Sequence, residues 1–184
     1  MLGKTAIHRL MSALSYASIM HKGQVRKDGT ATPYINHPLE VVHLLTTAGV
    51  NDVETLMAAA LHDVVEDCGV TLNNLLLAFN SPLVVEIVDS LSDDKALPKA
   101  DRKRLCIEHA PTLLPQAKLI KVADLSCNCT DILAKLPIGW SIERGTQYFE
   151  WAQQVVSAIG SIDNVYLTEN FRIIYSMKDR IGHN

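Results

Sequence analysis

Residues 56–67 read LMAAALHDVVED, a run of leucine, methionine and alanine that favours a helix and ends in ionisable side chains. Asp52 is expected to cap this helix, which is predicted over 52–66. At about 100° per residue, one imidazole and three carboxylates share an arc of roughly 140°. These side chains are His62, Asp63, Glu66 and Asp67. The face indicates a divalent cation, which imidazole and carboxylate bind together; an exposed acidic helix end beside a structural histidine is the alternative.

The rest of the chain repeats apolar residues at three- and four-residue steps, and no long segment alternates with period two. This spacing predicts about nine helices with short connections. Their expected ranges are 4–22, 37–45, 52–66, 72–79, 82–91, two between 98 and 134 of which the second covers 117–134, then 141–159 and 165–175. The sequence therefore predicts an all-α helical bundle, with residues 1–184 forming a single domain.

Composition limits the classes of partner. The 184 residues carry a net charge of −3, so the chain lacks the basic excess of a nucleic-acid binder, and no nucleic-acid partner is expected. It has no convincing cleavage site and no 18-residue apolar run, so we expect no signal peptide, no membrane span and a cytoplasmic location. The four cysteines form no CxxC pair, which favours reduced thiols.

Two residues distant from the quoted stretch extend the predicted cation site. His37 opens a helix after the long polar loop 23–36, and Asp124 lies within an apolar helical segment. A carboxylate in such a segment is costly to bury unless it is paired or bound to a metal. Two neutral histidines and two aspartates would balance a divalent cation. The candidate metal ligands are His37, His62, Asp63 and Asp124.

Five segments, in this order, resemble one known family. They are HKGQVRKDGTATPYINHPLEVV (21–42), AAALHDVVED (58–67), LPKADRKRL (97–105), AKLIKVADLSCN (117–128) and GWSIERGTQYFEW (139–151). Together they resemble the HD-type hydrolase domain of the RelA/SpoT proteins, and most of all the stand-alone small alarmone hydrolases such as the metazoan SpoT homologues. The resemblance covers residues 6–159.

The resemblance implies an HD-type helical fold and an enzyme that binds one Mn²⁺ at the four candidate ligands. It implies removal of the 3′-pyrophosphate from ppGpp or pppGpp, which yields GDP or GTP. Glu66 and Asp67 match the acidic pair that orients and deprotonates the attacking water. A metal-activated water and a carboxylate that accepts its proton are chemically consistent with these roles.

A nucleotide with many phosphates needs a cationic pocket in a net-negative protein. The polar loop offers Arg26 and Lys27, while Arg144 and Tyr148 lie one helical turn apart on a common face. By resemblance these positions contact the nucleotide, as does Asn128. The basic run of 99–104 supplies Lys99 and Arg102 as weaker candidates, against a solvated helix face as the simpler explanation. Trp140 either lies near the base or packs as an ordinary aromatic residue.

Several points stay open. The chain departs from many relatives at four positions near the expected base pocket, which are Leu125, Cys127, Cys129 and Thr130. Adenosine alarmones (ppApp-type) and NADPH, cleaved at its 2′-phosphate, are therefore alternative substrates, and a non-catalytic nucleotide-binding module is a third reading.

His21 is a possible neighbour of the site, whereas surface or core positions are expected for the remaining histidines, His8, His43, His109 and His183. The sequence leaves the choice between monomer and homo-oligomer undetermined.

Overall fold

The computed structural model describes residues 3–183, which contain ten α-helices and two 3-10 helices. The α-helices are α1 Lys4–Met20, α2 Asn36–Thr47, α3 Val53–Leu61, α4 Val64–Cys68, α5 Leu72–Phe79, α6 Pro82–Leu91, α7 Lys99–His109, α8 Pro115–Ala134, α9 Ile142–Ile159 and α10 Val165–Ser176. The 3-10 helices are η1 Ala110–Thr112 and η2 Lys178–Arg180. Within these residues the only β-pairing is an isolated bridge between Val25 and Pro33. The predicted all-α class is confirmed.

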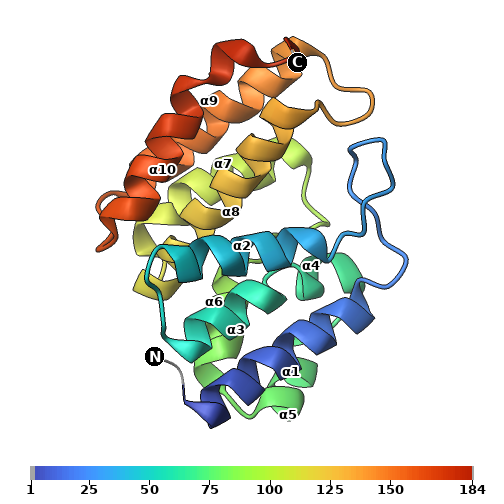
Figure 1. The fold of residues 1–184 in the computed structure, drawn as a ribbon, viewed down its shortest axis with the longest axis vertical. Helices are drawn as coiled ribbons and strands as arrows, with labels where there is room; N and C mark the ends of the chain where they lie inside the picture. The colour runs from blue at the N-terminus through green and yellow to red at the C-terminus, as the bar shows by residue number, and fades with distance from the viewer. Residues whose placement is uncertain (1–2, 184) are drawn as a thin grey trace.

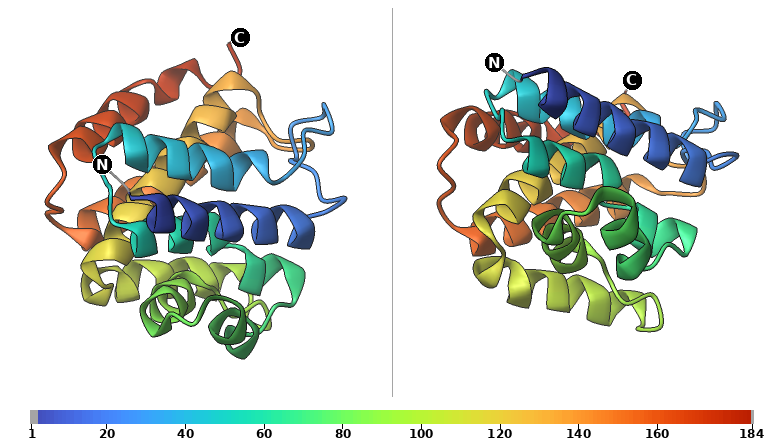
Figure 2. Two further views of the ribbon diagram at one scale, coloured as in Figure 1. Left: turned by 60° about the horizontal axis from the view of Figure 1, so that its bottom comes forward. Right: turned by 90° about the horizontal axis from the view of Figure 1, so that it is seen from below.

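Helix α3 lies at the centre of the half of the bundle that contains the N-terminus. It packs against α1, α2, α6 and α8, as the views in Figures 1 and 2 show. Every residue from Thr55 to Leu61 is buried, so this helix has no solvent face. Burying each large side chain, such as Leu56 or Leu61, contributes about 1.5–3 kcal/mol. The helix that carries the quoted motif is thus held on all sides.

Side-chain caps start several helices where the sequence predicts them. Asp52 accepts a hydrogen bond from the backbone N–H of Thr55 at 2.9 Å and begins α3. Thr71 and Asn74 form a reciprocal capping box at the start of α5. Each cap satisfies backbone N–H groups that the first helical turn leaves free.

The continuous helix predicted over 52–66 is wrong, because the chain turns at His62 and Asp63. Helix α3 ends at Leu61 and α4 starts at Val64, with Asp63 at φ −98° and ψ −8° between them. The ring Nδ1 of His62 donates a hydrogen bond to the carbonyl oxygen of Ala59 at 2.7 Å. This bond satisfies one of the carbonyl groups that the end of a helix leaves without a partner. The turn separates His62 and Asp63 from Glu66 and Asp67 on α4, so the predicted ionisable face becomes two pairs with different neighbours. Because one predicted helix is two, the described residues hold ten α-helices where about nine were expected.

Two loops meet at one side of the bundle. The loop between α1 and α2 folds back on itself, with Arg26 N–H donating to the carbonyl of Thr32 at 2.8 Å. The loop between α8 and α9 lies beside it, and Ile138 N–H donates to the carbonyl of Lys27 at 2.7 Å (Figures 1 and 2). The polar loop suspected of function is therefore anchored to the segment before α9. Within residues 3–183, no helix has the length and apolar character needed to cross a membrane.

Candidate active site

Three parts of the bundle bring the predicted metal ligands together. The ligand atoms of His37, His62 and Asp124 all lie within 4.8 Å of one another. His37 Nε2 lies 3.1 Å from Asp124 Oδ1, and Asp63 Oδ2 lies 3.2 Å from His62 Nε2. The same Asp63 oxygen lies 3.9 Å from His37 Nε2. All four candidates therefore meet where α2, α8 and the turn after α3 converge.

The hydrogen bonds of His62 suit a metal ligand. Its Nδ1 faces the carbonyl of Ala59 at 2.7 Å, so in the neutral ring Nδ1 carries the proton and Nε2 presents a lone pair. That Nε2 atom is buried and has no hydrogen-bond partner. Metal-bound histidines ordinarily donate their other ring N–H in this way. The donor set of two imidazoles and two carboxylates therefore fits a divalent cation.

The electrostatics of the cluster are strongly coupled. Burial lowers the pKa of His62, but the carboxylates of Asp63 and Asp124 outweigh it and raise that pKa to about 9. Burial raises the pKa of Asp63, yet the His62 charge and the other close contacts hold it well below its usual range. Lys121 places its Nζ 4.0 Å from Asp124 Oδ2. In the metal-free state the cluster attracts a proton to His62, which a divalent cation would have to displace.

Glu66 and Asp67 lie on the other side of the turn, in contact with positive groups. Glu66 accepts a hydrogen bond from the backbone N–H of Asp93 at 3.3 Å and lies 3.5 Å from Arg102 Nη1. Asp67 is paired with Lys95. Burial raises the pKa of Glu66, and the negative charges of Asp93, Asp63 and Asp67 add to that rise. A carboxylate with a raised pKa is a stronger proton acceptor near neutral pH. Within the acidic pair, Arg102 thus contacts Glu66 and Lys95 contacts Asp67.

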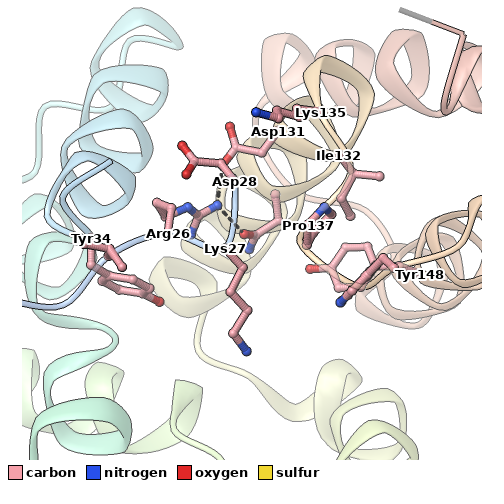
Figure 3. A pocket seen from close by; sticks show the side chains of 12 residues that line it. Arg26, Lys27, Asp28, Tyr34, Asp131, Ile132, Lys135, Pro137 and Tyr148 are labelled. Carbon is pink, nitrogen blue, oxygen red and sulfur yellow. Dashed lines mark hydrogen bonds and ion pairs between the residues drawn. The ribbon is translucent and has the colours of Figure 1, made fainter. Parts of the chain in front are cut away.

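A pocket of about 250 Å³ opens beside the cluster, between the two loops and helices α8 and α9 (Figure 3). Arg26 donates to Asn128 Oδ1 at 3.0 Å and is paired with Asp131, with Tyr34 and Tyr148 on either side of it in Figure 3. Asn128 in turn donates to Asp124 Oδ1 at 2.6 Å. The predicted substrate contacts Arg26, Lys27, Asn128 and Tyr148 all line this pocket.

A second, basic hollow adjoins the first and shares Trp140 and Tyr148 with it. The guanidinium of Arg144 lies 4.3 Å from the centre of a Trp140 ring, and Lys99 Nζ lies 5.6 Å from it. Burial lowers the pKa of Lys99, as do the charges of Arg144, Lys27 and Arg102. Positive charges that lower one another's pKa values repel each other, so binding of an anion between them is favourable. Lys99 is exposed, as is Arg104, so a solvated helix face still accounts for both, whereas Arg102 is partly buried and lies 3.5 Å from Glu66.

Comparison with known proteins identifies the family. The HD domain family matches residues 13–125, which is more than half of the chain. The chain belongs to the HD-domain family.

This HD domain is similar to named phosphohydrolases over most of its length. It is 47% identical over 152 residues to the human guanosine-3′,5′-bis(diphosphate) 3′-pyrophosphohydrolase MESH1, which covers 82% of this chain and 84% of that protein. The Drosophila melanogaster MESH1 is 44% identical over 149 residues, covering 80% and 83%. A solved structure described as a metazoan ortholog of SpoT that hydrolyses ppGpp superposes with a TM-score of 0.89 at 39% identity, covering 94% and 97%.

The four departures from the RelA/SpoT pattern do not line the 250 Å³ pocket of this HD domain. Leu125 and Cys129 are buried in the core, and Thr130 is exposed. Cys127 lines a different cavity, bounded by α2, α8 and α10. None of these positions therefore lines the pocket beside the cation cluster. All four cysteines, which lie within the described residues, are free thiols, as expected.

Sequence reasoning missed two polar residues of the HD site, Tyr34 and Lys121. Tyr34 donates to Asp63 at 2.7 Å, and it stands three residues before His37, a spacing that signals a neighbour of the site. Lys121 precedes Asp124 by one helical turn, which is an equally local signal. His21 is buried, and its ring lies 4.8 Å from that of Tyr34, so it does border the site. The other four histidines are exposed; they are His8, His43, His109 and His183.

Proposed function

We propose that this HD-domain protein removes the 3′-pyrophosphate from guanosine 3′,5′-bis(diphosphate), releasing GDP and pyrophosphate, and acts likewise on the pentaphosphate to yield GTP. The observation that carries the proposal is the continuity of the cation cluster with the cationic pocket. Asn128 bonds both Asp124 of the cluster and Arg26 of the pocket. The similarity to human MESH1, at 47% identity over most of both chains, supports the same substrate.

His37, His62, Asp63 and Asp124 would hold the cation, since imidazoles and carboxylates together suit divalent metals such as Mn, Fe or Zn. Among these we propose Mn²⁺, because the chain resembles the RelA/SpoT hydrolases. A cation at this point supplies a Lewis acid that polarises the phosphoryl group and acidifies a water molecule. Glu66 and Asp67 would orient that water and accept its proton. Lys95 and Arg102, which contact the pair, hold both carboxylates in place for this transfer.

The substrate's phosphates would be bound by the cations that surround the pocket. Arg26 already has its guanidinium fixed by Asn128 and Asp131, so it presents its remaining donors without further ordering. Lys27 and Arg144 add positive charge at the two loops. Charge-assisted bonds to phosphate are among the stronger hydrogen bonds in proteins. Tyr148 and Trp140 offer aromatic faces on which a base stacks.

The same lining supports a second candidate, an adenine nucleotide such as a ppApp-type alarmone or NADPH. Aromatic faces and phosphate-binding cations accept any purine, because stacking does not distinguish bases by their hydrogen-bonding edges. The proposal of ppGpp over these substrates rests on the similarity to the relatives.

A substrate panel tests the proposal. The purified protein, loaded with Mn²⁺, is incubated with ppGpp, ppApp and NADPH, and kcat/KM is compared by product release, with a chelator as control. Release of pyrophosphate from ppGpp, with the highest kcat/KM of the three and none after chelation, is the expected result. A higher kcat/KM for ppApp or NADPH than for ppGpp would identify that nucleotide as the substrate instead. Binding of ppGpp with no turnover of any of the three would support a non-catalytic nucleotide-binding module.

A further inference from the structure

The hydroxyl of Tyr34 contacts one particular oxygen of the candidate ligand Asp63. The phenol O–H donates to Asp63 Oδ2 at 2.7 Å. That oxygen is also the one that faces the histidines, at 3.2 Å from His62 Nε2 and 3.9 Å from His37 Nε2. Tyr34 therefore bonds the carboxylate oxygen that points toward the cation cluster.

Asp63 needs such a partner because of where it lies in the chain. It sits in the turn between α3 and α4, and it makes no side-chain capping bond to α4. The last torsion of an aspartate side chain is broad and roughly two-fold, so a carboxylate without a fixed partner rotates readily. Tyr34 and the two imidazoles are what define its orientation. Of these three side chains, only Tyr34 is not itself a candidate metal ligand.

Tyr34 is itself held from several sides. Its ring centre lies 4.8 Å from that of His21 and 6.0 Å from that of His37, and the guanidinium of Arg26 lies 5.6 Å from it. Its backbone N–H donates to the carbonyl of Gln24 at 2.9 Å, which ties it into the folded loop. The phenol is thus positioned before any ligand arrives, and it links the pocket loop to Asp63.

We propose that Tyr34 is a positioning residue for the cation site, whose hydroxyl selects Oδ2 of Asp63 as the oxygen that faces the cation. The inference rests on the proposed metal centre. A carboxylate oxygen has two lone pairs, so Oδ2 accepts the phenol proton with one and keeps the other for the cation. Loss of a hydrogen bond that orients a ligand typically weakens metal affinity about 10- to 100-fold.

The substitution Tyr34→Phe tests this, since it keeps the ring against its neighbours and removes only the hydroxyl. Tyr175→Phe is the matched control, because Tyr175 on α10 donates its hydroxyl to Glu150 at 2.9 Å, among residues that take no part in the proposed site. Mn²⁺ affinity is measured by calorimetry on the metal-free proteins. The rise in unfolding temperature on adding Mn²⁺ is measured within each variant, so that a change in metal-free stability does not enter.

The expected result is a Kd for Mn²⁺ raised about tenfold or more in Tyr34→Phe, with a smaller Mn²⁺-induced rise in unfolding temperature. Tyr175→Phe should match the wild type in both, and turnover by Tyr34→Phe should recover as Mn²⁺ is increased. Equal Kd values for Tyr34→Phe and the wild type, within about twofold, would overturn the inference. A wild-type protein that binds no Mn²⁺ would instead overturn the proposed metal centre, so the two failures are distinguishable.

Discussion

Arg26 and Asn128 lie 102 positions apart in the chain, yet Arg26 Nη2 donates to Asn128 Oδ1 at 3.0 Å. Asn128 also donates to Asp124 Oδ1 at 2.6 Å. Two consecutive hydrogen bonds therefore connect the loop after α1 to a candidate metal ligand on α8. A substitution in the loop is therefore expected to change substrate binding more than it changes the affinity for the cation, because Asn128 lies between Arg26 and Asp124.

Replacing Arg26 with glutamine should raise KM for ppGpp roughly 10- to 100-fold, because hydrogen bonds to a charged group contribute about 1.5–3 kcal/mol. The Kd for Mn²⁺ should stay within about twofold of the wild type. Steady-state kinetics and calorimetry measure the two quantities. Arg172→Gln is the control, since Arg172 is exposed and pairs only with Glu169 among the contacts described. An unchanged KM in Arg26→Gln would remove Arg26 from the substrate contacts.

Replacing Glu66 with glutamine should lower kcat about 10²- to 10⁴-fold, the usual contribution of a positioned proton acceptor. The amide keeps the size of the side chain and its hydrogen bond from Asp93 N–H, so Mn²⁺ affinity should change little. The matched control is Glu108→Gln, whose partner is the exposed Arg104. A kcat that stays near the wild-type value would assign proton transfer to Asp67 alone.

The pH dependence of kcat/KM should report the raised pKa of Glu66. Its base form is lost as the pH falls through that pKa, so the activity declines on the acid side. Burial and the negative charge of Asp93 both raise the pKa. Asp93→Asn removes that charge and leaves the backbone N–H, so the pKa should fall and the acid limb should move to lower pH. Asp94→Asn, at an exposed neighbour, is the control. A shift to higher pH in Asp93→Asn would contradict this assignment.

The buried helix α3 should be sensitive to lost side-chain volume. Leu56 is fully buried, so Leu56→Ala should lower the free energy of unfolding by about 2–5 kcal/mol. Leu77 on α5 is 76% exposed, and the same substitution there should change it by less than about 0.5 kcal/mol. Denaturant unfolding of the metal-free proteins measures both. Equal effects at the two positions would contradict the central place of α3 in the core.

Much of the fold is readable from local signals in the sequence. Apolar spacing locates the helices, and short side chains such as Asp52 and Thr71 mark where two of them begin. The break after Leu61 has no such local marker, since neither proline nor glycine stands there. It coincides with contacts made across the fold, where His37 lies 3.9 Å from Asp63 and Asp124 lies 3.9 Å from His62.

The composition of the candidate site is predictable to a similar extent. The four ligand candidates follow from residue type and motif, and the structure brings them together. The partners of Arg26 and Arg102 do not follow, because they are fixed by packing between segments distant in sequence. By contrast, a local reason explains why Leu125 and Cys127, close to Asp124 in sequence, do not line the pocket: the helix turns about 100° per residue and directs them to other faces.

The burial of α3 has a consequence for how the protein opens. A helix enclosed on all sides exchanges its amide hydrogens only when the whole domain unfolds, whereas loops open locally at little cost. His62 and Asp63 follow directly on this buried helix, while Arg26 and Trp140 belong to the loops. We therefore expect His62 and Asp63, two of the four candidate ligands, to be attached to a segment that opens late, and Arg26 and Trp140, which would contact the nucleotide, to lie in loops that open early.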